Sequence, residues 1–273
     1  MKKLIITSIL ITACSLAILP AYGQDSGDRL VVNFSDPSRP GLVKINLVNG
    51  SVTVKAYNGK EVTIESSQSR NRRDREPATR DGLRRIDTSA RGLVVEEENN
   101  VISITSRNPN DTGNLEIQVP AKTNLNLRSV NGGATTVEGV EGELEVTNIN
   151  SSVRMNNVAG SVVAHSTNGG VNVSLREITP NKPMSFTSMN GGVDVTIPGA
   201  AKANLKLRAD NGAIYSDFDV QVKPTTPTVD DRRNQGGRYR IETDKSINGT
   251  INGGGPDFEM RTLNGNIYLR KAK

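Results

Sequence analysis

Residues 166–175 read STNGGVNVSL, and two structures compete for this stretch. An Asn-Gly pair followed by an apolar residue at every second position is typical of a two-residue hairpin turn, because Asn and Gly adopt positive φ at little cost. The stretch could instead be one copy of a repeat in which every copy turns at the same point. The surroundings of the other Asn-Gly pairs distinguish the two interpretations.

Similar segments recur along the chain. Random placement of 28 Asn and 26 Gly in 273 positions would give about three Asn-Gly pairs, and the sequence has nine. In most copies the third residue after the Asn is apolar and the fifth usually is too, the period-two pattern of a strand with one buried face. A small residue two positions before the Asn suits a crowded interior. The copies are LVNGSVTV, SVNGGATT, STNGGVNV, SMNGGVDV, ADNGAIYS and TLNGNIYL, and NINSSVRM has Ser in place of Gly.

The spacing of these segments favours the repeat. The central copies follow one another at about 20 residues, which indicates stacked units, and a stacked corner meets the same neighbours in every copy. We therefore expect an all-β protein, a single-stranded β-helix (β-solenoid) with rungs of about 20 residues. Asn168 would lie between Asn150 and Asn190 at the ~4.8 Å strand spacing and form an Asn ladder. The expected structural corners are Asn131, Asn150, Asn168, Asn190, Asn211 and Asn264.

A longer similarity joins two regions. EIQVPAKTNLNLRSVNGG at 116–133 and DVTIPGAAKANLKLRADNG at 194–212 share a strand, a proline, a short basic bend, a second strand and an Asn-Gly corner. Since proline cannot donate a hydrogen bond within a sheet, Pro120 and Pro198 are expected to end one strand and turn the chain.

These segments resemble the DUF4097 family of β-strand-repeat proteins, whose domains are labelled as adhesins. The resemblance covers roughly residues 115–270, with a weaker start at KINLVNGSVTV (44–54). It implies a right-handed, single-stranded β-helix and no catalytic residues. The adhesin label describes the architecture better than any ligand.

The N-terminal residues have the layout of a secretory signal peptide, with two lysines, an apolar run and small residues before Gln24. We expect residues 1–23 to be removed, which leaves a single domain over residues 24–273. The protein would then be exported to the periplasm, the outer-membrane surface or the medium. Alternatively, the stretch ending at Cys14 is a lipobox that anchors the chain to a membrane. After Gly23 no apolar run approaches the ~20 residues of a membrane helix.

Composition excludes several classes of site. Cys14 is the only cysteine, so the mature chain has neither disulfides nor a thiolate metal site. Without Lys2 and Lys3 the chain has 32 basic and 29 acidic residues, an excess too small to indicate nucleic acid. His165 is the only histidine, and nucleotide, calcium and hydrolase motifs are missing, so we expect no cofactor and no metal.

Two polar segments interrupt the repeats, residues 66–92 with eight arginines and residues 223–240 with two prolines and several charges. Both are expected to be loops that leave the solenoid. The first could also be a basic patch for an anionic polysaccharide or lipid head group, although acidic residues are interleaved in it. The candidate residues of that patch are Arg72, Arg73, Arg84 and Arg85.

Catalysis has few candidate residues. Asp217 and Asp219 could share a face with Asp194 and Asp210 nearby in the chain, and paired carboxylates can perform acid and base chemistry. Exposed Asp also keeps an outward sheet face soluble, and we therefore expect no enzyme. Tyr215 and Tyr268 each follow their corner Asn by four residues and should point outward, but in distant rungs.

The sequence thus predicts an exported, non-enzymatic, adhesin-like module that contacts an envelope polymer or a surface protein. The alternatives are a carbohydrate-active enzyme on an anionic polysaccharide and a purely structural or regulatory envelope component. The C-terminal rung, TLNGNIYLRKAK, would be an uncovered edge, where Lys271 and Lys273 could oppose stacking or where end-to-end self-association could occur.

Overall fold

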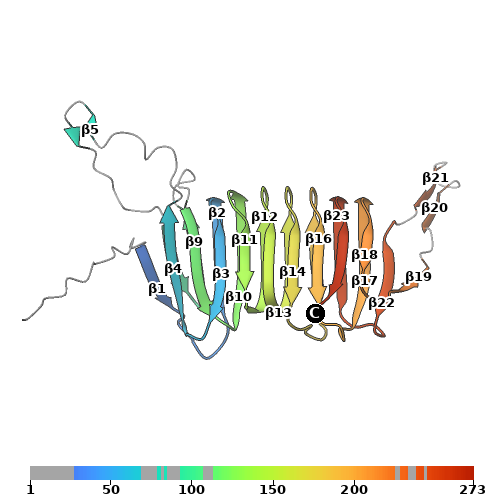
Figure 1. The fold of residues 1–273 in the computed structure, drawn as a ribbon, viewed down its shortest axis with the longest axis horizontal. Helices are drawn as coiled ribbons and strands as arrows, with labels where there is room; N and C mark the ends of the chain where they lie inside the picture. Colours follow the sequence, from blue (N-terminus) through green and yellow to red (C-terminus); the bar gives the residue numbers. More distant parts are fainter. Residues whose placement is uncertain are drawn as a thin grey trace, which may run out of the picture.

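The computed structural model describes residues 28–68, 79–80, 83–84, 93–106, 113–224, 228–232, 238–242 and 245–273. Within these ranges the chain is all-β, without a helix. Twenty strands form one sheet that folds over on itself as two rows (Figure 1). Two small separate pairs are β5 (Thr79–Arg80) with β6 (Leu83–Arg84) and β20 (Thr228–Arg232) with β21 (Arg238–Glu242). The predicted signal peptide and Cys14 lie outside the described residues.

The first row contains ten whole strands and half of an eleventh. In spatial order they are β7 (Leu93–Glu98), β8 (Val101–Ser106), β2 (Gly41–Asn49), β10 (Thr123–Asn131), β12 (Glu141–Asn148), the second half of β13 (Val153–Ser166), β15 (Met184–Ser188), β23 (Asp257–Asn264), β17 (Ala203–Asn211), β22 (Ile247–Ile251) and β19 (Gln221–Lys223). From β8 to β17 every pairing is parallel, and the outer strands are antiparallel.

The second row faces the first. Its spatial order is β1 (Asp28–Asn33), β4 (Glu61–Gln68), β9 (Gly113–Pro120), β3 (Val52–Tyr57), β11 (Thr135–Glu138), the first half of β13, β14 (Val171–Leu175), β16 (Val193–Ile197), β24 (Ile267–Lys271) and β18 (Ile214–Ser216). Pairing is parallel from β9 to β18.

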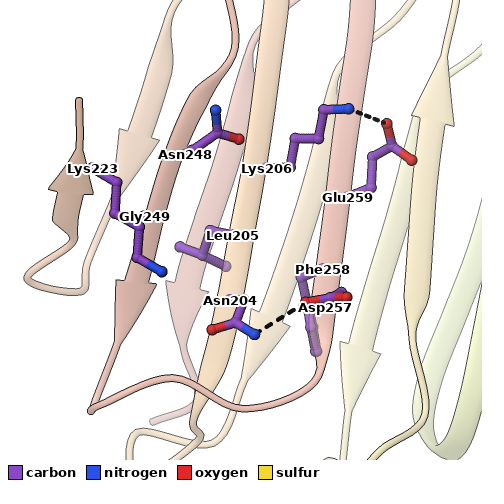
Figure 2. Close-up of a pocket in the computed structure, with 9 residues that line it drawn as sticks. All are labelled: Asn204, Leu205, Lys206, Lys223, Asn248, Gly249, Asp257, Phe258 and Glu259. Carbon is purple, nitrogen blue, oxygen red and sulfur yellow. Dashed lines mark hydrogen bonds and ion pairs between the residues drawn. The ribbon is translucent and has the colours of Figure 1, made fainter. Parts of the chain in front are cut away.

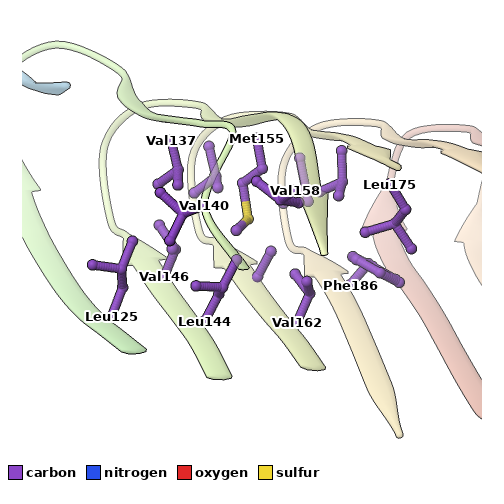
Figure 3. Packing of buried hydrophobic residues seen from close by; sticks show 14 of the residues in the cluster. Leu125, Val137, Val140, Leu144, Val146, Met155, Val158, Val162, Leu175 and Phe186 are labelled. Carbon is purple, nitrogen blue, oxygen red and sulfur yellow. The ribbon is translucent and has the colours of Figure 1, made fainter. Parts of the chain in front are cut away.

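One apolar core lies between the rows. Strands such as β16 alternate buried and half-buried residues, because successive side chains of a strand point to opposite faces. Figure 3 shows side chains of the first row, such as Leu144 and Val162, opposite Val140 and Met155 from the other side. Most core residues are Val, Ile and Leu, with Phe186 and Phe258 among the largest fully buried side chains. The low aromatic content therefore suits a narrow core between the two rows of strands.

The Asn-Gly corners join a strand of the first row to a strand of the second. We call such a unit, two strands and the corner between them, a layer. Val171, after the corner at Asn168, pairs in parallel with Val153 in the first half of β13. The second half of β13, directly before the corner, pairs in parallel with β12 and β15. The hairpin interpretation of STNGGVNVSL is therefore wrong. In the central region successive layers are neighbours in space, as the repeat predicted: Leu125 pairs with Leu144, and Leu144 with Val162.

At both ends of the stack the spatial order departs from the sequence. The C-terminal layer, β23 and β24, lies between the layer of β15 and β16 and the layer of β17 and β18 (Figure 1). The expectation that the C-terminal rung is an uncovered edge is therefore wrong, since it has a parallel neighbour on each side in both rows. Likewise β2 and β3 lie between β8 and β9 on one side and β10 and β11 on the other.

The long sequence similarity corresponds to these departures. Strand β9 ends at Pro120 and β16 ends just before Pro198, as predicted. In both places the chain then crosses to the first row and skips one layer: β9 connects to β10 past β2 and β3, and β16 connects to β17 past β24 and β23. Each proline-containing bend thus leaves a one-layer gap that a distant segment of the same chain fills.

Close approach of the layers explains the glycine after each Asn. A Cβ at Gly169 would lie 2.5 Å from the carbonyl carbon of Ser151, and one at Gly132 would lie 2.4 Å from backbone atoms of Gly50. Positive φ adds a second reason at Gly132, where φ is +129°. Glycine is therefore required chiefly because the backbones of neighbouring layers touch at the corner.

The small residues before the corners also have a defined role. Ser166, Ser188 and Thr262 are almost fully buried, and each donates its hydroxyl to a carbonyl at the corner of the neighbouring layer, at 2.7–2.8 Å. These bonds satisfy carbonyl groups that the turn leaves without a ladder partner. The hydroxyl of Ser129, in the equivalent position, is buried without a partner.

Candidate functional site

The six predicted corner residues form one column. Each amide Nδ2 donates to the Oδ1 of the next Asn: Asn150 to Asn131, Asn168 to Asn150, Asn190 to Asn168, Asn264 to Asn190 and Asn211 to Asn264, at 2.5–2.9 Å. The predicted position of Asn168 between Asn150 and Asn190 is confirmed. The column does not follow the sequence order after Asn190, because Asn264 and not Asn211 is the next residue, and Asn211 follows Asn264.

The column has a direction, since every amide donates the same way. Asn211, in the outermost layer that carries a corner on this side, is the first donor of the column, and Asn131 is the last acceptor. The column is therefore a structural device along one edge of the stack, and its exposed amides line the corner side of the protein.

The outer face of the second row carries an exposed aromatic cluster at the same end. Tyr215 of β18 and Tyr268 of β24 are paired in register, and their rings stack with centroids 5.2 Å apart and planes 11° apart. The expectation that these residues lie in distant rungs is wrong, because the inserted C-terminal layer places β24 beside β18. Tyr215 has 52% of its surface exposed.

Charged and polar groups surround the two rings. The guanidinium of Arg270 lies 4.8 Å from the centroid of the Tyr268 ring, within the range of a cation–π interaction. Its Nε donates to both carboxylate oxygens of Asp194, at 2.9 and 3.0 Å. This hydrogen bond raises the pKa of Arg270 above its usual value, with smaller contributions from other charges, including Asp217. Asn266 donates its amide to the Tyr268 hydroxyl at 3.1 Å.

We call Tyr215, Tyr268, Arg270, Asp194, Asp217 and Asn266 the tyrosine patch. Tyr268 has Tyr215 on one side and the Arg270 guanidinium near its ring. On the side of Tyr215 away from Tyr268, the second row has no further strand within the described part of the chain. Tyr215 is therefore the outermost ring of the patch among the described residues, half exposed and next to two carboxylates, a guanidinium and an amide.

The structure brings together two of the four predicted carboxylates. Asp194 and Asp217 both belong to the tyrosine patch, and Asp217 accepts the backbone N–H of Lys271 at 3.2 Å. Asp210 instead binds Arg208 at 2.8 Å on the other row, and Asp219 is exposed beyond the end of β18. His165 lies between buried Ala164 and Ser166, on the outward side of β13 as predicted.

The predicted arginine patch cannot be placed. Arg72, Arg73 and Arg85 lie outside the described residues, and of Arg84 the structure describes the backbone only, in β6. Among the described residues, no three His, Cys, Asp or Glu side chains gather as they would to hold a metal ion. The same residues include no helix long and apolar enough to cross a membrane.

A shallow depression of about 460 Å³ lies over β17, β22 and β23 (Figure 2). Its polar side chains largely bind one another: Lys206 approaches Glu259 at 3.9 Å, and Asn204 donates to Asp257 at 3.0 Å. The aromatic residue of this depression, Phe258, is buried, whereas Tyr215 of the tyrosine patch is half exposed, so the tyrosine patch is the better candidate. The depression is lined by Asn204, Leu205, Lys206, Lys223, Asn248, Gly249, Asp257, Phe258 and Glu259.

The chain resembles a protein of known structure in its fold. No family model matches this chain, and a search of curated proteins finds no match. The chain is similar to a crystal structure described as "a putative cell adhesion protein from Clostridium sporogenes ATCC 15579", with 10% sequence identity and a TM-score of 0.45. The alignment covers 90% of this chain and 100% of that one. A likeness at this level of identity and TM-score carries no argument about function.

Proposed function

We propose that this protein is an exported, non-enzymatic, adhesin-like module that binds a glycan of the cell envelope or cell surface. In this proposal the two rows are the faces of a right-handed, single-stranded β-helix like that of the DUF4097 family, with two layers inserted out of sequence order. The observation that carries the proposed function is the exposed ring of Tyr215, stacked on Tyr268 in the tyrosine patch.

Sugars present two kinds of surface, and the patch matches both. The C–H face of a pyranose ring is apolar and packs on an aromatic face, which supplies a large contact area at low cost in side-chain entropy. Hydroxyl groups at the sugar's edge need both donors and acceptors, which Asn266, Arg270 and Asp217 provide. Because Asp194 and Tyr268 already hold Arg270 in place, less side-chain freedom is lost on binding.

The same contacts support a binding role over catalysis. Both carboxylate oxygens of Asp194 accept the Nε–H of Arg270, so a catalytic role would require this carboxylate to give up its partner. The second carboxylate of the patch, Asp217, accepts the backbone N–H of Lys271. Both carboxylates are thus held by neighbouring groups of the protein, which suits a fixed recognition surface.

The test is retention of the mature protein on isolated cell envelopes and on a panel of neutral and anionic polysaccharides. A stacking contact of about 0.5–1.5 kcal/mol predicts that Tyr215→Ala weakens binding roughly two- to tenfold. Tyr57→Ala is the matched control, because Tyr57 lies in the same row near the other end and its hydroxyl binds the Glu61 carbonyl. Equal binding by the two variants would exclude the patch, and shortening of the bound polymer would support the enzyme alternative.

A further inference from the structure

We propose that the C-terminal segment, residues 257–273, is exchangeable between two copies of this chain, each copy filling the gap in the other. The segment consists of β23, the corner at Asn264, β24 and the residues that follow. This inference is independent of the proposed glycan binding. It rests on the gap, on the fit of the segment within it and on the connection that leads to it.

The gap exists because the chain skips a layer at Pro198. Strand β16 and strand β17 are joined by residues 198–202, yet they belong to layers that are not neighbours. Without the segment, β15 and β16 would expose one edge and β17 and β18 another, each with unpaired backbone groups. Unpaired strand edges readily accept another strand. The gap is therefore a preformed receptor for two strands joined by a corner.

The segment makes its contacts on both sides. Strand β23 pairs in parallel with β15 and β17, and β24 pairs in parallel with β16 and β18. Phe258, at 1% exposure, packs against Phe186 with ring centroids 6.0 Å apart. Asn264 donates to Asn190 and accepts from Asn211, which completes the Asn column. None of these contacts involves the connection to β22, so an identical segment from another copy would make all of them.

The connection to the segment is suited to opening. Residues 252–256 read Asn-Gly-Gly-Gly-Pro and cross the start of β17, where Asn252 donates to the Ala201 carbonyl at 2.7 Å and Asn204 donates to the Gly255 carbonyl at 2.6 Å. Asn252, Gly253 and Gly254 all have positive φ. Extending this loop would release those conformations and let five residues span up to about 17 Å. Exchange of an identical element through such a loop is a low-cost route to a dimer.

The partner is therefore a second copy of this chain. A copy supplies the same core side chains and the same corner Asn in the same register, so the exchanged state keeps the contacts of the closed one. The two states differ in the loop at 252–256 and in the entropy of association, which high protein concentration offsets. A foreign strand would have to reproduce both the buried positions of β23 and the Asn264 contacts.

Cysteine pairs across the gap test the exchange. Ser185 of β15 and Glu259 of β23 are register partners with outward side chains, and neighbouring strands are ~4.8 Å apart, a spacing that a disulfide can bridge. Ser185→Cys and Glu259→Cys are made in separate full-length copies, both with Cys14→Ser, and carry different mass tags. The two are unfolded and refolded together at high concentration, then oxidised.

We expect a disulfide-linked species that contains one copy of each variant. The matched control is a mixture of Asn126→Cys and Glu145→Cys copies, register partners in layers joined by a short connection, which should give only a background amount. The Ser185→Cys/Glu259→Cys double variant, refolded dilute, should form its bond within one chain and shows that the register is intact. Mixed dimers no more abundant than in the control, with that internal bond present, would overturn the proposal.

Discussion

Replacing Asn168 by alanine interrupts the Asn column at its middle. The side chain of Asn168 donates to Asn150 at 2.8 Å and accepts from Asn190 at 2.9 Å, so the substitution removes two hydrogen bonds and leaves one donor and one acceptor without a protein partner. A hydrogen bond contributes about 0.5–1.5 kcal/mol to the free energy of unfolding. The column is exposed and water can replace the lost partners, which places the expected loss in the lower part of the combined range, about 1–2 kcal/mol.

Thermal unfolding followed by circular dichroism measures this loss. For a chain of this size each kcal/mol shifts the midpoint by about 2–4 °C, so Asn168→Ala should lower it by roughly 2–8 °C. Asn211→Ala, at the end of the column, removes only the bond to Asn264 and should cost about half as much. Asn172→Ala is the control, because Asn172 lies on the outward face of β14 and has no side-chain hydrogen bond to any described residue.

Equal midpoints for Asn168→Ala and Asn172→Ala would refute the reasoning. The column would then be a consequence of how the corners stack and not a source of stability. A larger loss for Asn211→Ala than for Asn168→Ala would equally contradict the count of bonds, because the end residue has fewer partners than the middle one.

Three further predictions concern other parts of the chain. Gly160→Ala should lower the unfolding midpoint by several degrees, because Gly160 has a φ of +107° and a Cβ there would lie 2.0 Å from the Gly142 carbonyl oxygen; Gly199→Ala, with no atom within 4 Å, should change little. Hydrogen bonding with Ser35 is the main cause that lowers the pKa of Glu97 below its usual value of 4.5. The carboxylate therefore stabilises the folded state above pH 4.5, and this stabilisation is lost as the pH falls through the lowered pKa. A Glu97→Gln variant should lack this part of the fall in unfolding midpoint between pH 6 and pH 3. Neutralising the four arginines of the predicted basic patch together should abolish salt-sensitive retention on an anionic polysaccharide. These residues are Arg72, Arg73, Arg84 and Arg85. Unchanged retention would exclude the basic-patch hypothesis.

The central layers were predictable from the sequence because their determinants are local. An apolar residue three positions after each corner, a small residue two positions before it and a spacing of about 20 residues were enough to place Asn168 beside Asn150 and Asn190. The same pattern identified Asn150 as a corner although Ser151 follows it in place of glycine. Each of these features reflects contact with the next layer, so each copy of the repeat carries it.

The order of the layers at the ends was not predictable in the same way. The corner at Asn264 has the same flanking pattern as the corner at Asn211, so nothing in either segment says which of them stacks on Asn190. The similarity between 116–133 and 194–212 marked the two bends but not the skipped layer, because a proline ends a strand without specifying where the next one pairs. That missing order also hid the tyrosine patch: the sequence indicated that Tyr215 and Tyr268 point outward and could not show that they touch.

The inserted C-terminal layer has a mechanical consequence. A strand at the end of a stack can peel away when it is pulled, since its hydrogen bonds break on one side only and one after another. Strand β24 is bonded to β16 and to β18 at once, and tension along it would have to shear two ladders together. If the protein binds a surface through its outer face and is pulled through this segment, β24 should therefore resist detachment. In a stack that follows the sequence order the C-terminal strand would lie at the end, with one neighbour only, and would be the first to detach.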